Sequence, residues 1–185
     1  EEEFGSLADF REMVAAIHRA GMKIIIDFVP NHTGWDHAWI TDHPIYYTKN
    51  SQGEITEPLD PNNGDSKGWS DVAELDYNNF QMRKALTDEM IWWLTDCDVD
   101  GFRMDVISLI SKRPGLPDCP SDSIMDMIEF YANGPKIHEY LREMNEKVLS
   151  KYDIVTVGEG PGITTEVALD YIGKDRQELN MVFQL

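Results

Sequence analysis

The sequence predicts an α/β fold in which short parallel strands alternate with amphipathic helices, as in a (β/α) barrel. Three apolar runs rich in β-branched residues support this prediction: residues 23–28, 99–107 and 154–158. Short continuous apolar runs between helical patterns are typical of parallel strands buried on both faces. The runs end in or lead into polar residues: Asn31 and His32, Arg103 and Asp105, and Glu159. Functional residues at the carboxyl ends of several strands indicate a (β/α) barrel enzyme.

The first predicted helix spans residues 6–20, where apolar side chains recur every three or four positions along one face. Ser6 can cap the start of this helix, and Gly21 follows its last turn, where glycine is favoured. The first strand, over residues 23–28, follows directly. The chain therefore enters the sheet from a helix.

Residues 33–79 break the periodicity of both helix and strand. A loop of this length inside a compact domain is usually functional. It carries several aromatic side chains among Gly, Pro, Asn and Asp: Trp35, Trp39, Tyr46, Tyr47 and Trp69. Such rings can stack on the flat apolar faces of a ligand, sugar rings included, but we expect most of them to form a small core of the loop.

The rest of the chain alternates helices and strands. We expect a helix over 80–96, a strand over 99–107, a short helix over 124–131, a helix that starts near residues 134–135, a strand over 154–158, a helix over about 164–171 and a strand over 179–185. Such crossovers give parallel strands with right-handed connections. A doubly wound sheet is the rival architecture, but no Gly-x-Gly-x-x-Gly stretch follows any predicted strand.

Charged residues interrupt the apolar run of residues 99–107, among them one arginine and one aspartate that lie close together. Arg103 and Asp105 are two positions apart, so on a strand they point to the same side. A nearby guanidinium keeps a carboxylate ionised, and an ionised carboxylate fixed at a strand end can act as a covalent nucleophile. A structural ion pair inside a barrel would have the same spacing, so the pair alone leaves both interpretations open.

Composition excludes several classes of protein. With 185 residues, 42% of them hydrophobic, the chain can form a domain with a real core. Its net charge of −18 would repel nucleic acid, and it has no apolar run long enough to span a membrane. No signal peptide opens the chain, and its two cysteines make neither a disulfide framework nor a metal motif. We therefore expect a cytoplasmic protein with no nucleic-acid or membrane partner; its oligomeric state stays open.

Three stretches, taken in order, resemble the conserved motifs of the alpha-amylase family of glycoside hydrolases. They are Asp27-Phe-Val-Pro-Asn-His32, Gly101-Phe-Arg-Met-Asp-Val106 and Val157-Gly-Glu159. The resemblance implies a partial TIM (β/α)8 barrel, about strands 3–6, with a loop-rich subdomain inserted after strand 3. Residues 1–32 and 80–185 would then belong to the barrel, and residues 33–79 to the inserted subdomain.

The second half of the chain is similar to oligo-1,6-glucosidases and related alpha-glucosidases. The likeness lies in residues 110–112, 115–118, 133–135, 158–162 and 181–184. Val106 resembles the residue type of enzymes that accept alpha-1,6 linkages. The chain departs from these enzymes in a shorter insertion, in residues 73–78, and in Gly160, where a bulkier residue is common.

The resemblance implies a role for each matching residue. Asp105 would be the nucleophile and Glu159 the general acid and base; the implied substrate-binding residues are His32, Arg103, Asp27 and Val106. Asn31 matches a calcium ligand of alpha-amylases, although oligo-1,6-glucosidases do not use it so. The chemistry itself requires no cofactor, and calcium stays possible.

The expected activity is retaining hydrolysis of alpha-glucosidic bonds in oligosaccharides, exo-acting and with alpha-1,6 linkages favoured. The partner would be an alpha-gluco-oligosaccharide. The alternatives are an endo-acting alpha-amylase on alpha-1,4-glucans, or a non-catalytic relative that only binds. No part of the chain matches the family's third carboxylate, near strand seven, so we expect the isolated chain to be inactive.

Overall fold

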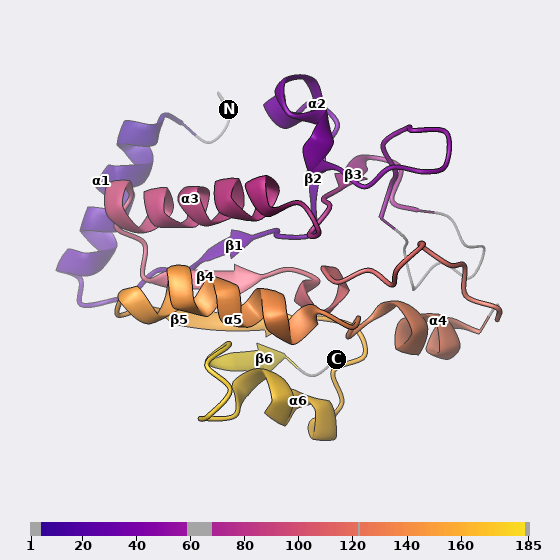
Figure 1. The fold of residues 1–185 in the computed structure, drawn as a ribbon. Helices are drawn as coiled ribbons and strands as arrows, with labels where there is room; N and C mark the ends of the chain where they lie inside the picture. The colour runs from indigo at the N-terminus through magenta and orange to yellow at the C-terminus, as the bar shows by residue number, and fades with distance from the viewer. Residues whose placement is uncertain (1–4, 59–67, 122, 184–185) are drawn as a thin grey trace.

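A parallel four-stranded sheet lies at the centre of the computed structural model, which describes residues 5–58, 68–121 and 123–183. The strands are β1 (Ile26–Phe28), β4 (Gly101–Met104), β5 (Val155–Glu159) and β6 (Met181–Phe183), in the order β1-β4-β5-β6. They are separated in sequence by α3 (Phe80–Asp96), α5 (Ile137–Lys147) and α6 (Thr165–Ile172), and α1 (Leu7–Arg19) precedes them. The predicted α/β class with a parallel sheet is therefore confirmed (Figure 1).

Local capping explains where the helices begin. Ser6 and Asp9 form a capping box at the start of α1, and the Asn79 side chain accepts hydrogen bonds from the first backbone N–H groups of α3. Thr164 caps α6 in the same way, and α6 ends at Gly173. The helix predicted to start near residues 134–135 begins at Ile137.

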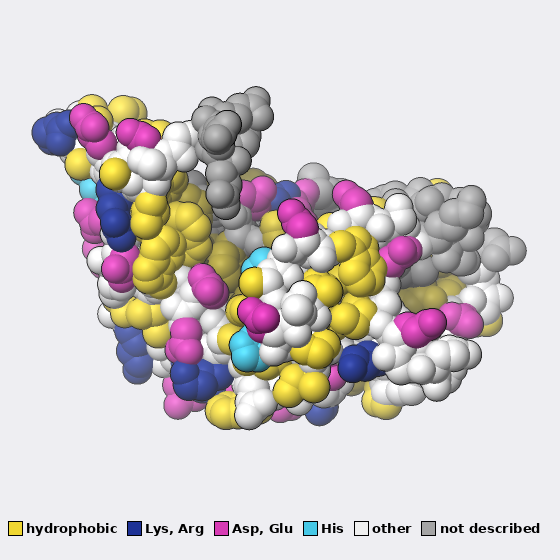
Figure 2. Space-filling view, turned by 90° about the horizontal axis from the view of Figure 1, so that it is seen from above, with side chains coloured by type: hydrophobic (Ala, Val, Ile, Leu, Met, Phe, Trp, Pro, Cys, Tyr) yellow, Lys and Arg dark blue, Asp and Glu magenta, His cyan; other side chains and the backbone are white. Residues whose placement is uncertain are grey.

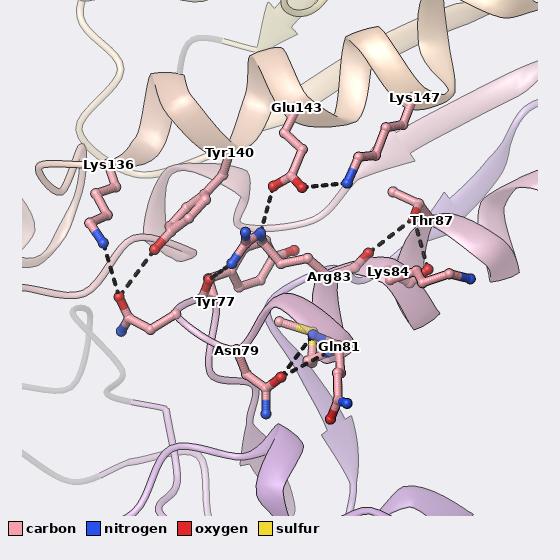
Figure 3. A network of polar contacts seen from close by, with 12 residues as sticks. Tyr77, Asn79, Gln81, Arg83, Lys84, Thr87, Lys136, Tyr140, Glu143 and Lys147 are labelled. Carbon is pink, nitrogen blue, oxygen red and sulfur yellow. Dashed lines mark hydrogen bonds and ion pairs between the residues drawn. The ribbon is translucent and has the colours of Figure 1, made fainter.

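A polar network joins α3 to α5 on the outside of the sheet (Figure 3). Arg83 donates to the Glu143 carboxylate at 2.6 Å and to the backbone carbonyl of Tyr77 at 2.6 Å. Its guanidinium also lies 5.2 Å from the ring centre of Tyr140, and Lys147 donates to the other oxygen of Glu143. The two helices that flank the central strands are thus held side by side.

The segment predicted as an irregular insertion contains regular structure. A two-stranded antiparallel sheet pairs β2 (His32–Gly34) with β3 (Val72–Glu74), and the short helices α2 (Ala38–Asp42) and η1 (Pro44–Tyr46) lie between these strands in sequence. Tyr46 and Tyr47 are buried, but they belong to the same core as the parallel strands and their helices and do not form a separate core of the insertion. Trp35 remains 38% exposed. In Figure 1, β2 and β3 lie beyond the ends to which the parallel strands point.

Three of the predicted strands are too long. The strand over 23–28 is limited to Ile26–Phe28, because the backbone N–H of Ile24 donates to the Asp100 carboxylate instead of a neighbouring strand. The strand over 99–107 ends at Met104, because the backbone turns left-handed at Val106 and continues into η2 (Ile107–Leu109). The last strand covers Met181–Phe183; residues 184–185 lie outside the described part.

Two further elements complete the chain, and the core lies between the sheet and the helices. α4 (Ile124–Tyr131) follows η2, and η3 (Leu149–Lys151) follows α5. Large apolar side chains from the sheet, η2 and the helices are fully buried: Phe102, Met104, Ile107, Met82, Met90 and Leu141. Packing of this kind supplies most of the stabilising free energy of a domain.

Apolar side chains are exposed along the two outer strands of the sheet. Ile25 and Val29, which flank β1, are 39% and 38% exposed, and Met181 and Phe183 in β6 are 46% and 47% exposed. The face seen from above carries acidic side chains scattered among apolar ones (Figure 2). None of the helices in the described ranges is long and apolar enough to cross a bilayer.

Candidate active site

The register of the sheet sets Asp105 beside Glu159. Met104 in β4 pairs with Gly158 in β5, and Asp105 and Glu159 come directly after this pair. Neighbouring strands lie about 4.8 Å apart, and residues paired in register point to the same side. The two carboxylates therefore leave the same edge of the sheet, at the carboxyl ends of adjacent strands.

Arg103 connects carboxylates from three strands. Its Nη1 atom lies 2.7 Å from Asp27 Oδ1 and 2.7 Å from Asp105 Oδ1, and its Nη2 atom forms an ion pair with Glu159. Burial lowers the pKa of Arg103, but the hydrogen bond to Asp27 and the charge of Asp105 raise this pKa above its ordinary value. The sequence-predicted cluster of Asp27, Arg103, Asp105 and Glu159 is thus assembled in space.

Backbone contacts fix the position of Asp105. Its N–H donates to the carbonyl of Phe28 at the end of β1, at 3.1 Å. The next residue, Val106, has φ 41° and ψ 38°, and its carbonyl accepts from the N–H of Leu109 at 2.9 Å. A β-branched residue in the left-handed region costs on the order of 1–3 kcal/mol, so the surrounding structure holds this turn against strain.

His32 is the first residue of β2, and the charge of Asp105 acts on its imidazole ring. Its Nδ1 atom is 3.3 Å from Asn31 Nδ2, and its ring meets Trp69 edge-on at 5.5 Å between centres. Burial, together with the charge of Lys112, lowers the pKa of His32, although the charge of Asp105 acts in the opposite direction. A neutral imidazole offers one donor and one acceptor, which suits a sugar hydroxyl.

Asn31 is fully buried and is held by a lysine. Lys112 Nζ donates to Asn31 Oδ1 at 2.7 Å and to the carbonyl of Leu109 at 2.7 Å, and it pairs with Glu74 at 3.1 Å. An ammonium group already satisfies the oxygen that would face a metal. These residues therefore do not fit a calcium ion, and the described part of the chain holds no cluster of three or more His, Cys, Asp or Glu suited to a metal.

A cavity of the described structure borders this lysine. It measures about 200 Å³ and is lined by the insertion and by the segment after η2, including Asn31, Glu74 and Lys112. Neither Asp105 nor Glu159 lines it. The carboxylates instead open to solvent, with side chains 25% and 22% exposed.

Lys112 and Glu74 are site residues that the sequence analysis did not single out. Glu74 stands in an apolar run between Ala73 and Leu75, both fully buried. An acidic residue inside a buried strand needs a cationic partner, so this pattern in the sequence indicates an ion pair at Glu74. The partner, Lys112, is 38 positions further along the chain and carries no local sign of its role.

Comparison with known proteins agrees with this geometry. The sequence model of one protein family, the alpha amylase catalytic domain, matches residues 1–63 and 65–185 of this chain. The oligo-1,6-glucosidase of Halalkalibacterium halodurans is 40% identical over 210 residues, which cover 99% of this chain and 37% of that enzyme.

Two solved structures show the same similarity. The trehalose-6-phosphate hydrolase of Bacillus licheniformis matches 100% of this chain and 37% of its own, with a TM-score of 0.84 and 32% identity. A mutant isomaltulose synthase of Erwinia rhapontici, solved in complex with sucrose, matches the same shares with a TM-score of 0.83 and 30% identity. The chain thus spans little more than a third of the length of these relatives.

Proposed function

Because this chain belongs to the alpha-amylase family, we propose that it carries the nucleophile and the general acid of a retaining glycoside hydrolase. The proposed substrate is an oligosaccharide with alpha-glucosidic bonds. One observation carries the proposal: the Met104–Gly158 register pair brings Asp105 and Glu159 side by side at the carboxyl edge of the sheet. Retaining glycosidases need two carboxyl groups about 5–5.5 Å apart, and adjacent parallel strands permit this spacing.

In the first step, Asp105 attacks the anomeric carbon and forms a glycosyl ester. Glu159 gives its proton to the glycosidic oxygen as the bond to the leaving sugar breaks. In the second step, Glu159 takes a proton from water, and the water oxygen displaces Asp105 from the anomeric carbon. Two inversions give overall retention, and Asp105 returns to its ionised form.

Arg103 has a different relation to each carboxylate in this proposal. Its hydrogen bond to Asp105 orients the carboxylate that attacks the anomeric carbon. Its ion pair with Glu159 occupies the carboxyl group that must give a proton to the glycosidic oxygen. Glu159 therefore exchanges its contact with Arg103 for one with the glycosidic oxygen when substrate binds. Asp27 keeps Arg103 in place during this exchange, and His32 binds a hydroxyl of the sugar in the first subsite.

The proposed fold is part of a (β/α)8 barrel, about strands 3–6, with residues 33–79 as the inserted subdomain. Exposed apolar side chains beside β1 and on β6 support it, because further strands would cover them. Within the family, exo-action on alpha-1,6 linkages is favoured by Val106 and by the oligo-1,6-glucosidase relative. The presence of both carboxylates disfavours a non-catalytic relative.

The direct test is to follow hydrolysis of isomaltose by proton NMR, with a full-length protein that contains this chain. We expect alpha-glucose as the first product, before mutarotation, and faster hydrolysis of isomaltose than of starch. Beta-glucose as the first product would contradict retention. Faster cleavage of starch would favour the endo-acting alpha-amylase, and no cleavage of either would favour a non-catalytic relative.

A further inference from the structure

We propose that Asn133 is a positioning residue that fixes the relative position of two loops, the nucleophile loop (residues 105–111) and the acid loop (residues 160–163). The inference rests on the proposed function, because it deepens the account of the same site. Asn133 lies in the turn before α5, outside the strands that carry Asp105 and Glu159.

Three hydrogen bonds place Asn133 between these loops. Its backbone N–H donates to the carbonyl of Ser108 in the nucleophile loop at 2.9 Å. Its side-chain Nδ2 donates to the carbonyl of Gly162 in the acid loop at 2.9 Å. Its Oδ1 accepts from the hydroxyl of Tyr171 in α6, at 2.5 Å. One residue therefore joins both loops and secures its own side chain on a helix.

The backbone next to Asn133 packs closely against the backbone of the nucleophile loop. Asn133 has φ 53°, in the left-handed region that asparagine tolerates better than most residues. A Cβ atom on the next residue, Gly134, would overlap the backbone carbonyl of Ser111. The Ser111 hydroxyl accepts from the N–H of Lys136 at 2.9 Å. The turn has little room to shift without moving the nucleophile loop.

A second link joins the two loops directly. The Ser108 hydroxyl donates to the carbonyl of Pro161 at 2.8 Å, and Ser108 is fully buried. A Cβ atom on Gly160 would lie 2.7 Å from Ser108 Cβ, so only glycine allows this approach. The acid loop thus packs against the nucleophile loop at Gly160, and hydrogen bonds of Asn133 connect the two loops.

This arrangement matters because the sheet ends at the two carboxylates. Asp105 is held to β1 by its hydrogen bond to Phe28, and Glu159 pairs with Phe183 in β6. The ladder between β4 and β5, however, ends at Met104 and Gly158, so beyond this pair the loops set the position of Asp105 relative to Glu159. A displacement of about 1 Å can reduce catalytic rate by about 100-fold. Asn133 has hydrogen bonds to both loops and to a helix outside them.

The test compares Asn133→Asp with Asn145→Asp in a full-length protein that contains this chain. Aspartate keeps the shape of asparagine and an acceptor for Tyr171, but it turns an oxygen toward the carbonyl of Gly162. Asn145 makes the same kind of bond elsewhere, from its Nδ2 to the carbonyl of Glu178 at 2.7 Å. The control therefore loses an equivalent hydrogen bond away from the carboxylates.

The kinetic readout uses two alpha-glucosides with different leaving groups. Isomaltose needs a proton from Glu159, whereas 2,4-dinitrophenyl alpha-glucoside leaves with little protonation. The readout is kcat/KM, which reports the first step, because Glu159 also serves as the base of the second step for both substrates. For Asn133→Asp we expect kcat/KM on isomaltose to fall by about tenfold or more, and kcat/KM on the aryl glucoside by less than about threefold. Asn145→Asp should change both by the same small factor. An equal loss on both substrates with Asn133→Asp, or no loss, overturns the proposal.

A structural readout separates this inference from the proposed function. Crystal structures should show the carboxyl groups of Asp105 and Glu159 moved apart by about 1 Å in Asn133→Asp and unmoved in Asn145→Asp. Unchanged positions overturn the inference even when the unaltered protein is active. An unaltered protein without turnover counts against the proposed function alone. If Asn133→Asp does not fold, Ser108→Ala removes the second link, and both readouts should change in the same direction; unchanged readouts overturn the inference.

Discussion

Arg103 reaches Asp105 through a single nitrogen, Nη1, which lies 2.7 Å from Asp105 Oδ1. The same nitrogen contacts Asp27, and the second nitrogen contacts Glu159. One guanidinium thus contacts three carboxyl groups at the edge of the sheet. Replacing Asp105 tests its proposed role as the nucleophile.

Asp105→Asn should abolish turnover of alpha-glucosides by a full-length protein that contains the chain. The amide cannot attack the anomeric carbon, and loss of a nucleophile costs about 10⁴-fold or more in kcat. Initial rates of glucose release measure the effect. Asp170→Asn, on the exposed side of α6, is the control and should retain full activity. Activity retained by Asp105→Asn would show that another residue is the nucleophile.

Arg103→Lys should reduce kcat/KM by about 10- to 100-fold. Lysine keeps the charge but cannot bridge Asp27, Asp105 and Glu159 with two nitrogens, and a hydrogen bond to a charged group is worth about 1.5–3 kcal/mol. Steady-state kinetics on isomaltose measures the change. Arg142→Lys changes an arginine that is half-exposed and paired with Glu178, and it should leave kcat/KM unaltered. Equal effects of the two substitutions would argue against a special role for Arg103.

Lys112→Met should destabilise the fold by about 3 kcal/mol, because it leaves Glu74 charged and buried without its partner. A chelator should not change the melting temperature of the unaltered protein, since Lys112 already satisfies Asn31. Thermal unfolding with and without EDTA measures both effects. Lys84→Met removes an exposed pair with Asp88 and should cost less than about 1 kcal/mol. A melting temperature lowered by EDTA would indicate a bound divalent cation after all.

Asp100→Asn should reduce stability at neutral pH, with a difference that disappears in acid. Burial raises the pKa of Asp100, but hydrogen bonds from Lys23, Ile24 and His18 outweigh it and lower this pKa to about 2. A carboxylate with a depressed pKa in the folded state stabilises above its unfolded pKa, near 3.8, and this contribution is lost as pH falls through about 2.

The expected stability difference for Asp100→Asn is about 2 kcal/mol at pH 7. Denaturant unfolding between pH 7 and pH 2 measures it. The control Asp96→Asn removes an exposed aspartate 3.9 Å from Arg11 and should have little effect at any pH. A difference for Asp100→Asn that stays constant down to pH 2 would contradict the assigned ionisation.

The sequence predicts the parts of this site that depend on periodicity and on short spacing. Arg103 and Asp105 are two positions apart, and the alternation of a strand brings them together. The end of β4 was not predictable, because apolar residues continue past it at positions 106 and 107 and nothing local signals the left-handed turn at Val106. The Asn31–Lys112 hydrogen bond spans 81 positions, and such a contact is decided by packing between elements.

In the insertion, too, contacts between segments far apart in the sequence could not be predicted. Its aromatic residues indicated a small core of its own, but Tyr46 and Tyr47 are buried in the same core as the strands and helices of the parallel sheet. The pairing of β2 with β3 was missed, because each strand has three residues and they lie almost 40 positions apart. A strand that short has no detectable period, and its partner far along the chain defines it.

The measurement that tests the central claim most directly is trapping of the glycosyl-enzyme intermediate. A full-length protein that contains this chain is incubated with 5-fluoro-alpha-glucosyl fluoride, digested, and analysed by mass spectrometry. We expect one added fluoroglucosyl group, on the peptide that contains Asp105, and none in Asp105→Asn. A label on a different residue would contradict the assignment of Asp105 as the nucleophile.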